Sequence, residues 1–183
     1  MESIKDKKRA IRKRMGQLNR SFSETYFNSK DAEIKRIILR KTEVFGAKTI
    51  LSYWSMPREA GTHKLNQELN DLGKTVLLPV IQDNELVLKA FTGLENMETE
   101  PKYGILEPKG KEFNDFHLID IVLVPGVAFT LSGLRCGHGK GFYDRLLPKL
   151  KSATTIGLCY EHQMLENLPT DHFDVTLNQV LFA

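Results

Sequence analysis

The sequence predicts an α/β fold: a three-layer sandwich of helices around a mainly parallel, Rossmann-like sheet, folded as a single domain over residues 1–183. The first observation is that short apolar runs alternate with segments of helical periodicity, which is typical of parallel sheets with crossover helices. The second is size, since 183 residues with 41% hydrophobic side chains can bury one sizeable core. The third is a glycine-rich loop at 133–145 that directly follows an apolar run. In parallel α/β sheets, ligands bind at loops that follow the carboxyl ends of the strands, and this loop has such a place.

The first half of the chain predicts three helices and three strands. The helices are expected at 3–19, 31–45 and 62–72, and the strands at 48–54, 75–80 and 85–91. Ser3 can cap the first helix, while Gly46 and Gly73 end the other two. The inward positions of the second helix are Ile34, Ile37, Ile38 and Val44. Asp83-Asn84 joins the last two strands as a hairpin or an edge addition to the sheet.

The second half of the chain carries the remaining strands. Residues 92–118 are rich in loops, and strands are expected at 120–125, 154–160 and 179–182. A helix is expected from about 140 to 150, after the glycine-rich loop. Two segments then follow strand ends, Trp54 to Glu59 and the glycine-rich loop, so we expect both of them at the ligand-binding edge of the sheet.

Charge and cysteine content narrow the class of protein. The net charge is only +3, but seven of the ten residues from Lys5 to Arg14 are basic, and this excess suits an anionic substrate, a nucleotide or nucleic acid. Lys8 and Arg12 are four positions apart and project from one helix face, where a solvated surface is the ordinary alternative.

The two cysteines form no zinc or disulfide pattern. No apolar run has the length of a membrane helix and no signal-peptide core follows Met1, so a cytoplasmic location is expected.

The loop 133–145 contains chemistry that packing does not explain. Its glycines at 137, 139 and 141 leave backbone N–H groups open to an anion, and the helix that follows adds its positive dipole end. The loop also holds the basic residues Arg135, His138, Lys140 and Arg145. Asp144 beside them suits a magnesium ion that is carried on phosphates. These residues predict a nucleotide-phosphate site with its metal.

Other interpretations of this loop are weaker. A purely structural turn between strand and helix explains the glycines but not the charges. A P-loop requires Ser or Thr after its lysine, and here Gly141 follows Lys140. The dinucleotide fingerprint does not fit either, because position 142 is Phe. The loop therefore binds anions by another geometry.

Taken together, these segments resemble the 5-formyltetrahydrofolate cyclo-ligase family, also called methenyltetrahydrofolate synthetase, over nearly the full length. The most specific match is 124–129 followed by 133–145, supported by 8–12, by 52–62 with Glu59, by 103–108 and by 168–174. The resemblance implies closure of 5-formyltetrahydrofolate to 5,10-methenyltetrahydrofolate with ATP and Mg²⁺, with release of ADP and phosphate through a phosphorylated formyl intermediate. The implied partners are ATP and the folate, which can carry additional glutamates. No nucleic-acid or membrane partner is expected, and the protein is expected to be a monomer.

The resemblance also implies roles for individual residues. The residues implied to bind ATP are Lys8, Arg12, Arg135, Cys136, Gly137, His138, Gly139, Lys140, Gly141, Phe142 and Tyr143. The residues implied to border the folate are Trp54, Met56, Glu59, Tyr103, His138 and Phe142. Asp144 and Asp174 would hold magnesium, and Lys140 and Arg145 would serve phosphoryl transfer as cations. Each has an ordinary structural alternative: Trp54 and Met56 as core, Glu59 as a surface charge and Asp174 as a loop residue.

The sequence departs from the family's usual residues at a few positions. Thr130 and Asn178 occupy positions where acidic residues are frequent in the family, and Phe142 one where Tyr is common.

A different enzyme class on a similar sheet, such as a sugar-phosphate isomerase or CoA transferase, would not consume ATP. A nucleic-acid-binding module would use the basic first helix, which lacks interleaved aromatic residues.

Overall fold

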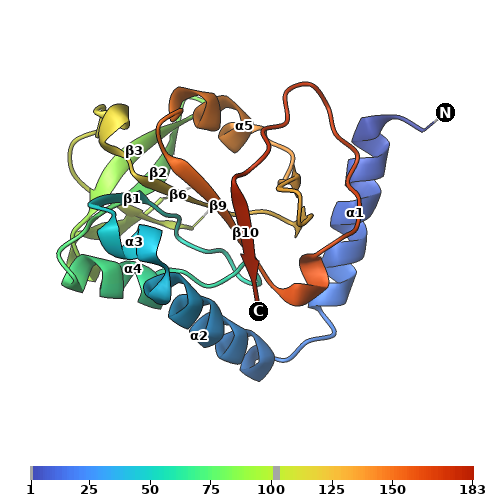
Figure 1. Ribbon diagram of the computed structural model, residues 1–183, viewed down its shortest axis with the longest axis horizontal. Coiled ribbons are helices and arrows are strands. Elements are labelled where there is room, and N and C mark those ends of the chain that lie inside the picture. The colour runs from blue at the N-terminus through green and yellow to red at the C-terminus, as the bar shows by residue number, and fades with distance from the viewer. Residues whose placement is uncertain (1, 101–103) are drawn as a thin grey trace.

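The computed structural model describes residues 2–100 and 104–183 and contains a six-stranded central sheet (Figure 1). The strand order is β10-β9-β6-β1-β2-β3, and every neighbouring pair is parallel except β2 and β3. The strands are β1 (Thr49–Leu51), β2 (Thr75–Gln82), β3 (Glu85–Phe91), β6 (Ile121–Val124), β9 (Thr154–Cys159) and β10 (Gln179–Phe182). This is the mainly parallel α/β sheet that the alternation of patterns predicts.

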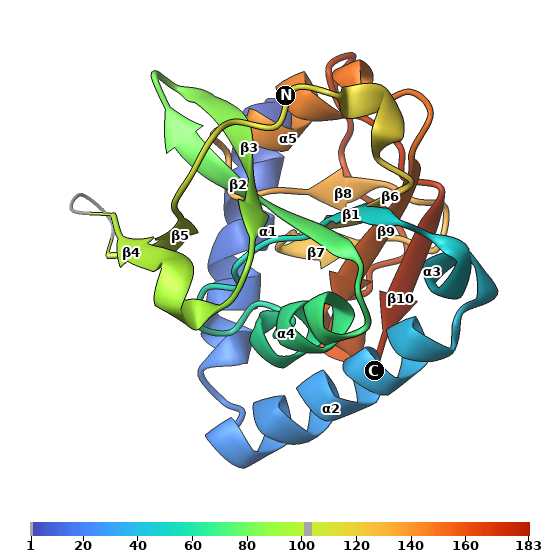
Figure 2. The same cartoon turned by 90° about the vertical axis from the view of Figure 1, so that its left-hand side faces the viewer.

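Helices cover both faces of the sheet and give the expected three layers (Figure 2). One face carries α2 (Glu24–Arg40), α3 (Thr42–Gly46) and α4 (His63–Asp71), and the other carries α5 (Phe142–Leu146) with the 3-10 helix η3 (Leu147–Lys149). The first helix, α1 (Ile4–Asn19), packs beyond the sheet against the β7–β8 hairpin (β7, Ala128–Phe129; β8, Arg135–Cys136). No helix among residues 2–100 and 104–183 is long and apolar enough to cross a bilayer.

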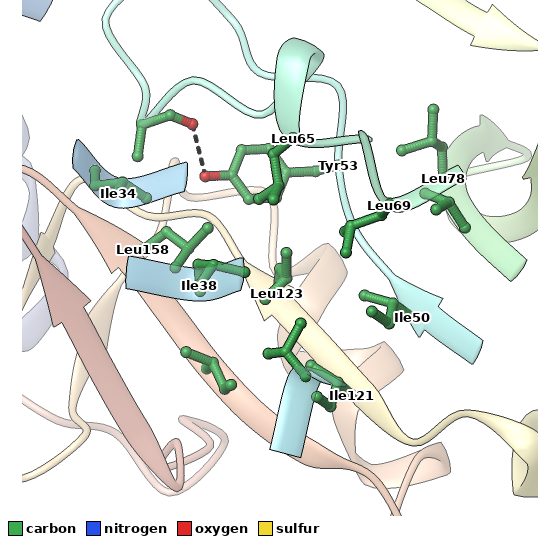
Figure 3. Close-up of a cluster of buried hydrophobic side chains, with 14 of the residues drawn as sticks. Ile34, Ile38, Ile50, Tyr53, Leu65, Leu69, Leu78, Ile121, Leu123 and Leu158 are labelled. Atoms are coloured by element: carbon green, nitrogen blue, oxygen red, sulfur yellow. Dashed lines mark hydrogen bonds between the residues drawn. The ribbon is translucent and has the colours of Figure 1, made fainter. Parts of the chain in front are cut away.

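The core is split by the sheet because neighbouring strand residues point to opposite faces. In β1, Ile50 packs with the α2 and α4 side chains (Figure 3), whereas Leu51 packs with those of α5 and η3. Ile34 and Ile38 of α2 are fully buried in the first cluster, as predicted, and Ile37 is partly buried against it. Tyr53 extends this cluster toward the carboxyl edge of the sheet, where its hydroxyl donates to the Ala60 carbonyl at 2.9 Å.

The predicted bounds of the second helix are wrong. The helix begins at Glu24, because Ser23 caps it by accepting a hydrogen bond from the Tyr26 N–H at 3.2 Å. It ends at Arg40, because Lys41 is extended (φ −73°, ψ 132°), and the short α3 follows it. Between Ser23 and Asp31 the only large apolar side chains are Tyr26 and Phe27, too few to show the periodicity on which the prediction relied, although Phe27 packs against the same core.

Several other elements are shorter than predicted, and four short strands were missed. The strand expected at 48–54 pairs only over Thr49–Leu51 before it turns away as a loop. The helix expected at 140–150 divides into α5 and η3, since Pro148 cannot continue an α-helical hydrogen-bond ladder. The missed strands form two small sheets, β4 (Met97–Thr99) with β5 (Leu106–Pro108) and β7 with β8.

The β2–β3 hairpin forms at the sheet edge as expected. Asp83 and Asn84 occupy left-handed backbone conformations (φ 48° and 66°), which suit a tight two-residue hairpin turn.

Candidate active site

A cavity of about 290 Å³ lies where the Trp54–Glu59 segment and the glycine-rich loop meet. The two segments lie beyond the carboxyl ends of β1 and of β6, as their place after strands predicts. Of the predicted site residues, those that line the cavity are Lys8, Arg12, Trp54, Met56, Glu59, Arg135, Gly137, His138, Gly139, Lys140, Gly141, Phe142, Tyr143, Asp144 and Asp174. Residues distant in the sequence thus surround one space.

The first helix supplies basic side chains to this cavity rather than a solvated face. Arg12 Nε donates to the Gly137 carbonyl at 2.8 Å, so the guanidinium lies directly against the glycine-rich loop. Gly139 is left-handed (φ 100°), and a Cβ there would come within 3.2 Å of the Arg12 guanidinium carbon. Lys140 is exposed and its ammonium has no polar partner among the described residues. The loop therefore offers free backbone and cationic groups to an anion.

Two carboxylates face the same cavity, each paired with a cation. Lys8 Nζ lies 2.5 Å from Asp174 Oδ2, and Arg135 Nη2 lies 2.6 Å from Asp144 Oδ1. Within residues 2–100 and 104–183 no three His, Cys, Asp or Glu side chains cluster closely enough to form a protein cage for a metal. The donor set fits a different arrangement, because Mg²⁺ typically takes one or two carboxylates and completes its shell with substrate phosphates and waters.

The opposite wall of the cavity is aromatic and apolar, with one buried carboxylate. Trp54 stacks on His63, with 3.9 Å between ring centroids. Glu59 is 9% exposed, and its Oε2 accepts a hydrogen bond from the Met56 N–H at 2.8 Å. Its other oxygen, Oε1, lies 2.7 Å from Nε2 of His138 in the glycine-rich loop. This wall suits a flat heterocycle that donates N–H groups to a carboxylate.

Tyr143 carries an unpaired polar atom into this site. Its hydroxyl is buried and has no hydrogen-bond partner among the described residues. Burial, with the nearby charge of Glu59 as the second cause, raises the pKa of Tyr143 well above its ordinary value, so the phenol remains a proton donor. The Arg135 guanidinium lies over its ring at 5.4 Å. A buried donor without a partner beside a cavity is a natural contact for a ligand oxygen.

Two predicted site residues, Cys136 and Arg145, do not line the cavity. The Cys136 side chain packs with Met15 away from the cavity, and burial raises the pKa of its thiol. Arg145 lies outside the cavity, where it donates to the carbonyls of Lys140 (3.1 Å) and Asn84 (2.8 Å) and covers the Phe142 ring. Tyr103 lies outside the residues that the structure describes.

One wall of the cavity was not predicted from the sequence. This wall comes from the β2–β3 hairpin, from β5 and from the residue before β5, and consists of Pro79, Ile81, Leu86, Ile105, Leu106 and Glu107. Burial raises the pKa of Glu107, whose carboxylate accepts a long 3.4 Å bond from the Ile81 N–H. Alternating apolar residues in a strand predict core, so nothing in the sequence marked Pro79, Ile81 and Leu86 as cavity lining. Residues 105–107 belong to the segment 103–108 that supports the family resemblance, but only Tyr103 of that segment was expected at the site.

Two departures from the family pattern have structural explanations. Thr130 is buried, and its hydroxyl accepts a hydrogen bond from the Leu134 N–H at 3.1 Å within the β7–β8 turn. Asn178 accepts hydrogen bonds from both the N–H and the hydroxyl of Thr155, each at 2.8 Å. Neither side chain lines the cavity.

Comparisons with known proteins identify the family of this chain. The family model described as the 5-formyltetrahydrofolate cyclo-ligase family matches residues 4–183. A 5-formyltetrahydrofolate cyclo-ligase of Haemophilus influenzae is 34% identical over 182 residues, covering 96% of this chain and 97% of the relative. The solved structure of 5,10-methenyltetrahydrofolate synthetase from Aquifex aeolicus superposes with a TM-score of 0.85 at 29% identity, covering 96% of this chain and 89% of that one. The chain therefore belongs to the 5-formyltetrahydrofolate cyclo-ligase family.

Proposed function

We propose that this protein converts 5-formyltetrahydrofolate to 5,10-methenyltetrahydrofolate in a reaction that consumes ATP with Mg²⁺ and releases ADP and phosphate. One observation carries the proposal: a single cavity joins a cationic glycine-rich loop, two carboxylates and an aromatic wall with a buried carboxylate. A nucleotide phosphate chain fits the first two features, and a reduced pterin fits the third. The features that would recognise the two substrates thus line one cavity.

The ATP phosphates lie, in this proposal, along the glycine-rich loop. Lys8, Arg12 and Lys140 supply positive charge, and the exposed backbone of 137–141 supplies N–H donors. Asp144 and Asp174 would hold the magnesium ion, which neutralises phosphate charge when bound. Arg145 acts as a positioning residue, because its two hydrogen bonds tie the loop at Lys140 to the β2–β3 turn.

The pterin lies against the opposite wall, with Trp54 and Met56 as apolar contacts. Glu59 accepts hydrogen bonds from the amino and ring N–H groups of the pterin, which compete with His138 for its carboxylate. Tyr143 donates its hydroxyl to an oxygen at the junction of the two substrates, since its buried O–H otherwise lacks a partner.

The chemistry requires activation of a poor electrophile. The formyl carbon on N5 is amide-like and its oxygen is a poor leaving group. Transfer of the γ-phosphoryl group of ATP to that oxygen gives an imidate-like phosphate. N10 of the same folate then attacks the formyl carbon and a C–N bond forms. N10 loses its proton to solvent, the C–O bond breaks and phosphate leaves. Phosphoryl transfer needs positioning and charge neutralisation rather than a protein nucleophile, and the cations around the loop serve both needs.

The experiment that tests this proposal follows methenyltetrahydrofolate by its absorbance while ADP is measured in parallel. With ATP and Mg²⁺ we expect one ADP for each methenyl product, and no product when ATP is omitted. Product formation without ATP, or ATP hydrolysis that does not depend on the folate, would contradict it. A sugar-phosphate isomerase or a CoA transferase would show neither product.

A further inference from the structure

Glu107 lines the active-site cavity, and the proposed reaction does not use it. Its half-buried side chain extends from β5 into a wall that is otherwise apolar, beside Ile81 and Leu86. Among the described residues the carboxylate has no ion-pair partner, and its one hydrogen bond is the long 3.4 Å bond from the Ile81 N–H. A carboxylate that the protein satisfies so little is available to a ligand in the cavity.

This position is costly for a carboxylate. Burial, as the largest cause, raises the pKa of Glu107, and the charges of Glu100 and Glu98 act in the same direction. The bond from Ile81 and the charge of Lys89 oppose this shift but do not cancel it. Glu98 also stands directly opposite Glu107 in the β4–β5 pair, and like charges in such a pair destabilise a sheet. Residues that break a local rule in this way concentrate at functional sites.

Glu107 and Glu59 face the cavity from different walls. β5 lies against β2 (Figure 2), where the Ile81 N–H reaches Glu107. In the sheet, β2 is next to β1 on the side opposite β6. Glu59 follows β1 but turns toward the β6 side, because its carboxylate contacts His138 in the glycine-rich loop. The cavity therefore extends between the two carboxylates.

A folate in this cavity presents different ends to the two carboxylates. The inference rests on the proposed function, in which Glu59 accepts hydrogen bonds from the amino and ring N–H groups of the pterin. C6, which carries N10 through a methylene group, lies at the far end of the ring system from these donors. The N10 end therefore points away from Glu59, toward the wall that contains Glu107. We propose that Glu107 is a catalytic base that takes the proton from N10 during ring closure.

Ring closure releases one proton. When N10 attacks the formyl carbon of the phosphorylated intermediate, the new C–N bond leaves N10 as an ammonium. Its N–H bond breaks, the proton passes to the Glu107 carboxylate and the electron pair stays on N10. That pair forms the C=N bond of the methenyl cation as the C–O bond breaks and phosphate leaves. Glu107 then releases the proton to solvent through its exposed part.

The surroundings of Glu107 suit this step. An ammonium on an aryl-substituted nitrogen is a strong acid, and the raised pKa of Glu107 makes its carboxylate the stronger base, so the transfer is favourable. The methenyl product carries a positive charge shared between N5 and N10. A carboxylate on an apolar wall also stabilises that charge as it develops.

The test replaces Glu107 with glutamine and measures methenyltetrahydrofolate and ADP in the same reaction. Glutamine keeps an oxygen for the Ile81 N–H and removes the repulsion from Glu98, so the melting temperature should not fall. We expect methenyl formation to slow about 100-fold or more, the usual contribution of a general base. Phosphorylation does not need Glu107, so in a rapid-quench first turnover ADP should appear at the wild-type rate and exceed the methenyl product.

Glu98→Gln is the matched control. It removes the same charge from the same strand pair, but Glu98 is exposed and does not line the cavity, so both rates should equal those of the wild type. Glu107→Asp keeps a carboxylate, one methylene farther from the substrate, and should recover part of the rate of methenyl formation.

Equal rates for Glu107→Gln and the wild type would overturn the inference, while one ADP for each methenyl product in the wild type would still support the proposed function. A variant in which ADP and methenyl formation slow together would also overturn it, because Glu107 would then act in substrate binding or phosphoryl transfer. A wild type that forms no methenyl product would overturn the proposed function and this inference with it.

Discussion

Glu59 and His138 lie 79 positions apart in the sequence, yet their side chains meet across the cavity, with Oε1 and Nε2 separated by 2.7 Å. This contact joins the loop after β1 to the glycine-rich loop. In the proposed function a pterin would compete with His138 for the same carboxylate oxygen. In the proposed function this contact therefore lies where the two substrates would meet.

Glu59→Gln tests the pterin contact. We expect KM for the folate to rise roughly 10- to 100-fold while KM for ATP changes little, because a neutral amide loses charge-assisted hydrogen bonds to the pterin donors. Steady-state kinetics with each substrate varied in turn measure this. His138→Ala is the matched comparison, since it removes the partner and keeps the carboxylate. Identical profiles for the two variants would mean that Glu59 acts only through His138.

Lys140→Ala tests the glycine-rich loop. Lys140 is exposed to the cavity and has no partner within the described residues, so its loss should not affect folding. We expect turnover to fall about 10- to 1000-fold if the ammonium contacts the transferred phosphoryl group. Lys151→Ala, an exposed lysine outside the cavity, is the control. Unchanged kcat and unchanged KM for ATP would remove Lys140 from the mechanism.

Asp144→Asn tests the magnesium contact. Asp144 also accepts a hydrogen bond from Arg135, and the amide retains an oxygen for that bond, so the fold should survive. We expect a higher Mg²⁺ concentration for half-maximal activity, because magnesium prefers charged oxygen ligands. A magnesium titration at fixed ATP measures the shift. Asp171→Asn, on an exposed turn near the cavity, is the control, and an unaltered titration for Asp144→Asn would exclude this role.

The sequence predicted those parts of the fold that follow from local periodicity. It predicted only part of the site. Asp83-Asn84 marked the hairpin correctly, whereas the start of α2 was missed because residues 24–30 lack an apolar stripe and depend on the Ser23 cap. Lys8 and Asp174 pair across 166 positions, and no spacing rule predicts such a contact. Glu107 reaches the cavity from a short strand that forms only through tertiary packing. Residue chemistry thus marked the glycine-rich loop, but chain topology determined what surrounds it.

We expect the stability of the fold to decrease in acid because of two histidines. Burial lowers the pKa of His63, which stacks on Trp54, and of His162, which packs between Phe22 and Tyr160. The unfolded chain then binds protons more readily than the native one, so stability is full above the ordinary histidine pKa of 6.5 and falls as pH drops below it. Melting temperatures measured from pH 8 to pH 5 should fall mainly below about pH 6.5. His162→Phe should flatten this dependence, and an equally steep loss in that variant would contradict the assignment.

Gly133→Ala tests the attachment of the β7–β8 turn to the segment before β10. Gly133 is left-handed (φ 87°), and its carbonyl accepts a hydrogen bond from the Leu177 N–H at 2.9 Å. A methyl group there would collide with the Leu177 carbonyl oxygen, which is backbone and cannot rotate away. We expect a loss of unfolding free energy of about 2 kcal/mol or more in denaturant titrations, from backbone strain and steric displacement together. Gly16→Ala is the matched control, because Gly16 is helical with open space around its Cβ position, and alanine should stabilise it by about 0.5–1 kcal/mol. Equal stability changes for the two variants would show that the turn moves freely and that the Leu177 contact does not hold it.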